Sequence, residues 1–114
     1  MSIQSLKNRE FSPVYRRGKR SADPCFVLYF LENGTDGNRL GITVSKKVGN
    51  SVVRSRVKRI IKEAYRLHEQ DLCQGLDIVI VARSAAADKK STDMEVSLMR
   101  LAKRLKIRKE SSSI

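Results

Sequence analysis

The sequence is short of the residues from which catalytic and metal centres are built. It has one histidine and two cysteines among 114 residues. Cys25 and Cys73 lack the CxxC or Cys/His spacing of a metal site, and no serine or cysteine has a credible His/Asp partner. We therefore expect no metal bound by the protein. Both thiols are expected to be small buried hydrophobic residues rather than a disulfide.

The few candidates for acid–base chemistry do not form a site either. His68, the only histidine, lies at the end of a basic helical segment near its apolar stripe, which favours a packing or capping role. Three acids, Glu63, Glu69 and Asp71, lie close together near one end of the basic helix. By themselves they do not suggest the site of a metal-dependent nuclease, which gathers several acidic ligands around its ions. The protein alone is therefore not expected to be a catalyst.

Long hydrophobic runs are also absent. No apolar stretch approaches the roughly 20 residues of a membrane-spanning helix, and the N-terminus lacks the apolar core of a signal peptide. We expect a cytoplasmic protein that does not bind membranes. The length predicts one domain, over residues 1–106, followed by a basic, disordered tail at 107–114.

Acidic residues are scarce beside the basic ones. Twenty-four Lys and Arg stand against twelve Asp and Glu, which gives a net charge of +12. Such a charge favours nucleic acid as the partner, with an anionic membrane as the competitor that the missing apolar runs weaken.

The positive charge is most concentrated in the segment RSRVKRIIKEAY, from Arg54 to Tyr65. Helical periodicity over Val52 to His68 gathers one apolar stripe, formed by Val53, Val57, Ile60, Ile61, Ala64 and Tyr65. Four cations border this stripe and two lie opposite it: Arg54, Lys58, Lys62 and Arg66, then Arg56 and Arg59. Only Glu63 offsets them, so they repel one another unless a polyanion binds. Because Lys46 and Lys47 lie just upstream, a phosphate-binding surface is favoured over a merely solvated face.

The remaining sequence predicts a compact α+β domain, in which a small mixed sheet packs with helices in the order α-β-β-α-β-α. Ser5 is the expected N-cap of the first helix, and the first two strands are expected to form a hairpin. The apolar third strand is expected to be covered on both faces. The predicted elements are helix Leu6–Arg17, strands Cys25–Leu31 and Arg39–Ser45, the basic helix, strand Leu76–Ala82 and helix Met94–Leu105.

Four blocks of sequence together resemble a known family. They are LKNREFSPVYRRGKR at 6–20, FVLYFL at 26–31, GITVSKKVGNSVVRSRVKRIIKEAYR at 41–66 and DIVIVAR at 77–83. In this order and at this spacing they closely resemble the bacterial ribonuclease P protein subunit. One departure is Ser55, which stands where the family usually carries asparagine between two arginines.

The resemblance implies a protein that assists a catalytic RNA. That RNA uses Mg²⁺ and removes the 5′ leader from precursor transfer RNA (tRNA), so the protein is a subunit of the endonuclease without catalytic residues of its own. The resemblance also implies a left-handed strand–helix–strand crossover through the basic helix, whereas the general rule predicts a right-handed one.

The resemblance further implies roles for individual residues. Three aromatic residues, Phe11, Tyr15 and Tyr29, match positions that line the family's central cleft, where the single-stranded leader lies. Aromatic faces suit this task because any base can stack on them, at roughly 1–3 kcal/mol per base. Ordinary core packing is an equal alternative for Phe11 and Tyr15. The residues implied in RNA binding are Lys46, Lys47, Arg54, Arg56, Lys58, Arg59, Lys62 and Arg66.

Two other functions are compatible with part of this pattern. A ribosomal protein or RNA chaperone would share the charge and the lack of a catalytic site. A DNA-binding protein would place the basic helix in a major groove, but the chain lacks the helix-turn-helix pair that normally presents such a helix.

Overall fold

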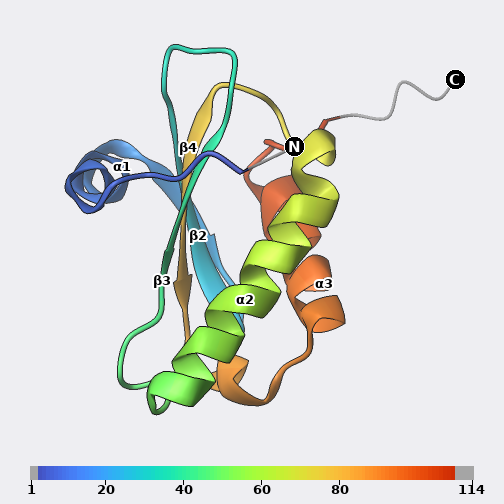
Figure 1. Cartoon of the computed structure of the whole chain (residues 1–114). Helices are drawn as coiled ribbons and strands as arrows, with labels where there is room; N and C mark the ends of the chain where they lie inside the picture. Colours follow the sequence, from blue (N-terminus) through green and yellow to red (C-terminus); the bar gives the residue numbers. More distant parts are fainter. Residues whose placement is uncertain (1–2, 110–114) are drawn as a thin grey trace, which may run out of the picture.

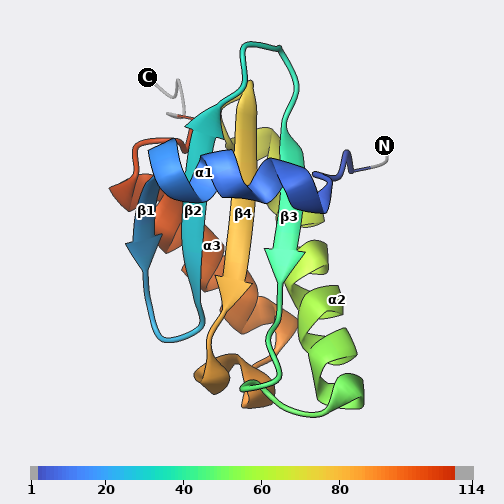
Figure 2. The same ribbon diagram turned by 90° about the vertical axis from the view of Figure 1, so that its left-hand side faces the viewer.

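The computed structural model describes residues 3–109, which form a four-stranded sheet with one helix on one face and two on the other (Figures 1 and 2). The α+β class is confirmed, with one short strand, β1, added to the predicted order. No helix in this part of the chain is long and apolar enough to cross a membrane. The elements are α1 Phe11–Arg17, β1 Lys19–Ala22, β2 Phe26–Glu32, β3 Arg39–Thr43, α2 Ser51–His68, β4 Leu76–Ala82 and α3 Ser91–Arg104, with short 3-10 helices at Asn8–Glu10, Glu69–Asp71 and Ser84–Asp88.

The sheet has the order β1-β2-β4-β3, so the predicted hairpin of β2 and β3 is wrong. β4 lies between these two strands, antiparallel to β2 and parallel to β3. The reason is that six of the seven β4 residues are buried, and a strand covered on both faces is most stable with a partner at each edge. A hairpin does form, but between β1 and β2.

The connection from β3 through α2 to β4 is left-handed, as the resemblance implies (Figure 2). With this strand order, the hand of the crossover decides which face of the sheet α2 covers. A right-handed connection would place α2 on the face that α1 crosses. The left-handed one places it beside α3, over the strand residues Leu28, Ile78 and Ile80, which are at most 1% exposed.

The basic helix is held by its predicted apolar stripe. Val57, Ile60, Ile61, Ala64 and Tyr65 are all buried, and Val53 packs against the same core cluster. Asn50 is the N-cap, because its side chain accepts a hydrogen bond from the Val53 N–H at 3.0 Å. The prediction for this helix is confirmed.

The first helix starts later than predicted, because the residues before it pair with β3. The Leu6 N–H donates to the Leu40 carbonyl at 2.9 Å, and the Leu40 N–H donates to the Gln4 carbonyl at 2.8 Å. Ser5 lies in this extended segment and is therefore not an N-cap. Pro13 is tolerated in α1 because it falls in the first turn, where no helical hydrogen bond needs its missing N–H.

The first residues of the predicted tail, 107–109, pair with the segment around Leu72. Ile107 is buried, and its carbonyl accepts a hydrogen bond from the Cys73 N–H at 2.6 Å. The Lys109 N–H likewise donates to the Asp71 carbonyl at 2.7 Å. Residues 110–114, the rest of the predicted tail, lie outside the described residues. Both cysteines are free thiols. Cys25 is buried, as expected, whereas Cys73 is only half-buried.

One ion-pair network ties α1 to the sheet. The Arg39 guanidinium binds both Asp77 carboxylate oxygens, with Nε–Oδ1 2.8 Å and Nη2–Oδ2 2.7 Å, and its Nη1 donates to Glu10 Oε2 at 2.6 Å. The Asn33 amide donates to Asp77 Oδ1 at 2.9 Å. Burial by itself would raise the pKa of the Asp77 carboxyl, but the hydrogen bonds from Arg39 and Asn33 outweigh it and hold that pKa below its usual value.

We expect Arg39→Ala to destabilise the fold by about 1.5–3 kcal/mol, because it leaves the nearly buried Asp77 carboxylate without its charged donor. The pKa of Asp77 is depressed in the folded state, so the network's contribution is fully present above the unfolded pKa of roughly 3.9. It is lost as pH falls through the folded pKa. Urea unfolding of the wild type and variant from pH 7 down to pH 2 measures this. Arg20→Ala, which removes an exposed cation on β1, is the control. If the difference in free energy of unfolding between wild type and Arg39→Ala stays constant down to pH 2, the explanation is contradicted.

Candidate nucleic-acid interface

The outer face of α2 carries cations that have no counter-ions among the described residues. Lys58, Arg59 and Lys62 are exposed, and none of them forms an ion pair within residues 3–109. Arg66 alone is paired, with Glu63 at 2.7 Å. An unpaired row of like charges on a well-anchored helix is a surface that an anionic partner stabilises.

Two arginines near the start of α2 are less open to solvent. Arg54 is half-buried, and its Nε has no hydrogen-bond partner within the described residues. Arg56 donates from Nη1 to the Ala87 carbonyl at 3.2 Å and from Nη2 to the Lys89 carbonyl at 2.6 Å. It therefore lies against the segment that leads into α3 rather than on a free outer face. Two of its five guanidinium donors are occupied by the protein.

Lys46 and Lys47 lie beside the N-terminus of α2, as expected from their position in the sequence. Both are exposed in the turn between β3 and α2. The turn is anchored by Val48, which is buried and whose N–H donates to the Ser45 carbonyl at 3.1 Å. The two ammonium groups thus add to the positive end of the helix dipole, which itself favours anions.

The three aromatic residues of the predicted cleft come together on the other face of the sheet. The ring centroids of Tyr15 and Tyr29 are 4.9 Å apart and those of Phe11 and Tyr15 are 6.4 Å apart, both in edge-to-face arrangements. Tyr15 is 39% exposed, and its hydroxyl lies 3.5 Å from Thr43 Oγ1. Two elements, α1 and β2, therefore build one aromatic cluster, formed by Phe11, Tyr15 and Tyr29.

This face is only partly covered, because α1 crosses the strands and is short (Figure 2). Val14 and Val79 are fully buried beneath it, whereas Val27 and Val81, which pair in register on β2 and β4, stay half-exposed. Phe11 fits on β3 because Gly41 has no side chain: a Cβ there would lie 2.5 Å from two ring carbons. Phe11 therefore has a packing role, while Tyr15 is largely a surface residue.

The chain passes directly from the aromatic cluster to the basic surface. Thr43, which touches Tyr15, ends β3, and Lys46 follows in the turn before α2. A single strand of nucleic acid on the aromatic cluster would therefore have cations within reach of its phosphates.

A second group of cations, which was not predicted from the sequence, lies at the end of α1. They are exposed and take part in no ion pair among the described residues. The signal was present in the sequence as RRGKR, in which four of five residues are basic: Arg16, Arg17, Lys19 and Arg20.

His68 joins α2 to its neighbours, which fits the packing role expected for it. Its Nε2 lies 2.8 Å from Glu95 Oε1 on α3, and its Nδ1 lies 3.1 Å from Asp71 Oδ2. The hydrogen bond to Glu95, and then the one to Asp71, raise the pKa of His68 despite its partial burial. Within residues 3–109, no group of three or more His, Cys, Asp or Glu side chains could hold a metal ion.

Comparison with known proteins relates this sequence and fold to one family. The sequence model of the ribonuclease P family matches residues 4–106. The ribonuclease P protein component of Clostridium botulinum (strain Loch Maree) is 52% identical over 99 residues, covering 86% of this chain and 89% of the relative. That of Lachnoclostridium phytofermentans is 50% identical over 105 residues, covering 91% and 90%.

Solved structures agree. The ribonuclease P protein of Staphylococcus aureus superposes with a TM-score of 0.83 at 34% identity, covering 96% of this chain and 100% of that one. That of Thermotoga maritima gives 0.80 at 30% identity, covering 89% and 96%. The chain therefore belongs to the ribonuclease P protein family.

Proposed function

We propose that this chain is the RNA-binding protein subunit of ribonuclease P, which assists a catalytic RNA in removing the 5′ leader from precursor tRNA. The observation that carries the proposal is the adjacency of two surfaces in a member of this family. One is a row of unpaired cations on α2, and the other is the half-exposed aromatic cluster reached through β3. The relatives named above are all ribonuclease P proteins, so the ribosomal-protein and chaperone alternative has no support.

The basic surface suits a structured RNA. Its cations lie at successive turns of one straight helix, so several phosphates can be bound without any rearrangement of the protein. Binding would release counter-ions from the RNA and would relieve the repulsion among Arg54, Lys58 and Lys62. We assign the catalytic RNA to this surface and to Lys46 and Lys47 beside it.

The aromatic cluster suits a single strand. Tyr15 and Tyr29 offer stacking surfaces that accept any base, which matches a leader of variable sequence. The half-exposed Val27 and Val81 extend this surface along the sheet. We therefore assign the leader of precursor tRNA to this face. The Mg²⁺ used in cleavage is assigned to the catalytic RNA, and no described residue is given a metal-binding role.

The first prediction concerns the division of labour. Purified protein, treated to remove RNA, should not cleave precursor tRNA, and addition of the cognate catalytic RNA at low Mg²⁺ should give cleavage that the RNA alone performs poorly. Gel analysis of 5′ leader release under the three conditions measures this. Cleavage by RNA-free protein would refute the assignment of catalysis to the RNA.

A second prediction tests the basic surface. Replacing Arg54, Lys58 and Lys62 together by Ala should leave the melting temperature almost unchanged, because the buried stripe of α2 remains. Affinity for the catalytic RNA should fall, and its log–log salt dependence should become shallower by roughly 0.7–0.9 for each phosphate that the variant no longer binds. A variant lacking the exposed cations Lys103, Arg108 and Lys109 is the charge-matched control. An equal fall in affinity for the two variants would mean that only net charge matters.

A third prediction tests the aromatic cluster. Tyr15→Ala should weaken binding of precursor tRNA to the holoenzyme by roughly 1–3 kcal/mol and leave binding of mature tRNA unchanged, because only the precursor has bases to stack on the ring. Tyr15→Phe keeps the ring and should behave as wild type. If Tyr15→Ala weakens binding of precursor and mature tRNA alike and lowers the melting temperature, the ring has a packing role and does not bind the leader.

A further inference from the structure

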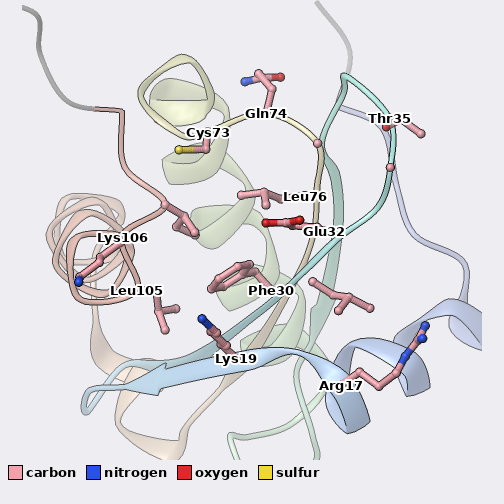
Figure 3. A pocket seen from close by; sticks show the side chains of 14 residues that line it. Arg17, Lys19, Phe30, Glu32, Thr35, Cys73, Gln74, Leu76, Leu105 and Lys106 are labelled. Atoms are coloured by element: carbon pink, nitrogen blue, oxygen red, sulfur yellow. The ribbon is translucent and has the colours of Figure 1, made fainter.

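A pocket of about 630 Å³ opens at the end of the sheet where α1 and α3 both terminate (Figure 3). Apolar side chains line its inner part, among them Phe30, Leu76 and Leu105. Its volume is that of a site for a small organic ligand. None of the residues predicted to bind RNA or the leader lines it.

The pocket is lined by more positive than negative charge. Arg17, Lys19 and Lys106 line it together with one carboxylate, Glu32. None of these three cations forms an ion pair or a side-chain hydrogen bond within residues 3–109. Apolar walls beside free cations suit a ligand with a flat apolar body and an anionic group, and a nucleobase with its phosphate is such a ligand.

The backbone at Lys106 is an independent sign that its side chain matters there. Lys106 is the only non-glycine residue among those described with a positive φ, at 61°. It ends α3 in a Schellman motif: its N–H donates to the Lys103 carbonyl at 3.1 Å, and the Ile107 N–H donates to the Ala102 carbonyl at 3.0 Å. Glycine takes this conformation without the steric cost that a Cβ incurs. The chain instead holds a lysine at the rim of the pocket (Figure 3). Its side chain extends away from Phe30 there, and its flexible stem allows the ammonium to swing toward a bound ligand.

The pocket also adjoins the surface assigned to the leader. Leu31 lines it and lies two residues beyond Tyr29 on the same face of β2, a spacing of about 6–7 Å. Arg17 lines it and ends α1, on which Tyr15 lies. The inner lining at Phe30 and Leu105 packs with the core on the opposite face of the sheet. A single strand that stacks on Tyr15 and Tyr29 therefore reaches this pocket when it continues past the end of α1 and turns around the end of β2.

We infer that this pocket binds one unstacked nucleotide of the precursor leader, beyond the nucleotides on the aromatic cluster. The base packs against the apolar lining at Phe30 and Leu105, and the phosphate binds the ammonium groups of Lys106 and Lys19. The inference rests on the proposed leader-binding function and adds a second, separately testable binding site to it.

Cys73 supplies a direct measure of occupancy, because its half-buried thiol lines the pocket whereas Cys25 is buried in the core. Iodoacetamide alkylates a thiol when the thiolate displaces iodide, so a bound nucleotide should slow this reaction. In the holoenzyme, a cleavage-resistant precursor should slow alkylation several-fold, and mature tRNA should not. Mass spectrometry locates the adduct, and Cys73→Ser should remove the fast-reacting site.

Lys106→Gly provides the decisive variant. It removes the ammonium and the strained Cβ together, so protection of Cys73 at a fixed, subsaturating precursor concentration should disappear while the melting temperature stays equal or rises. The salt dependence of precursor binding should become shallower by about 0.7, the value for one phosphate of a single strand. Lys103→Ala removes the same charge from the neighbouring turn of α3, outside the pocket, and should retain protection.

The outcomes separate this inference from the proposed function. In one outcome, the precursor fails to protect Cys73 from alkylation while Tyr15→Ala still weakens binding of precursor tRNA and not of mature tRNA. That result overturns the pocket assignment and leaves leader binding in place. Equal protection by precursor and mature tRNA, or full protection by the catalytic RNA alone, also overturns it. If neither Cys73 nor Tyr15 distinguishes precursor from mature tRNA, leader binding itself is rejected.

Discussion

Burial of β4 on both faces is the constraint on which the rest of the structure depends. Leu76, Ile78 and Ile80 pack toward α2 and α3, while Val79 packs beneath α1. Such a strand needs a neighbouring strand at each edge. β4 is the last strand in the sequence, yet it lies between β2 and β3 and pairs with both. That position requires a crossover from the edge strand β3 back into the sheet, and the left hand sends it to the face that α1 does not occupy. The basic helix is thus part of the connection that completes the sheet.

Stability and binding are divided between two sides of α2. The buried stripe fixes the helix, so the outer cations can remain unpaired without loss of the fold. Arg56 departs from this division, since its hydrogen bonds to the Ala87 and Lys89 carbonyls hold the segment before α3. Its neighbour Arg54 keeps an unsatisfied Nε within the described residues. One arginine of the pair flanking Ser55 is therefore positioned by the protein, and the other retains donor capacity for a ligand.

The parts of the fold that the sequence predicted well are those set by local pattern. The basic helix was expected over 52–68 and runs over Ser51–His68, and β4 has the predicted limits. One failure is local, because strand β1 and its hairpin with β2 were not predicted. The other failures involve partners distant in sequence. Local turn signals could not reveal that β4 separates β2 from β3, nor that residues 107–109 pair beside Leu72. Periodicity placed Arg56 on the outer face because it does not show which segments pack there. The hand of the crossover followed from family resemblance alone.

The aromatic cluster could be named from sequence, but its openness could not. It depends on how much of the sheet α1 covers, and α1 is fixed at its start by the Glu10–Arg39 ion pair and the pairing of Leu6 with Leu40. Its far end is fixed by Gly18, where a Cβ would lie 2.4 Å from the carbonyl oxygens of Val14 and Phe30. The helix is thereby held across one part of the sheet, and the rest of that face stays accessible. A site formed by such fixed elements binds a flexible strand without first having to order itself, so the entropy cost of binding falls mainly on the RNA.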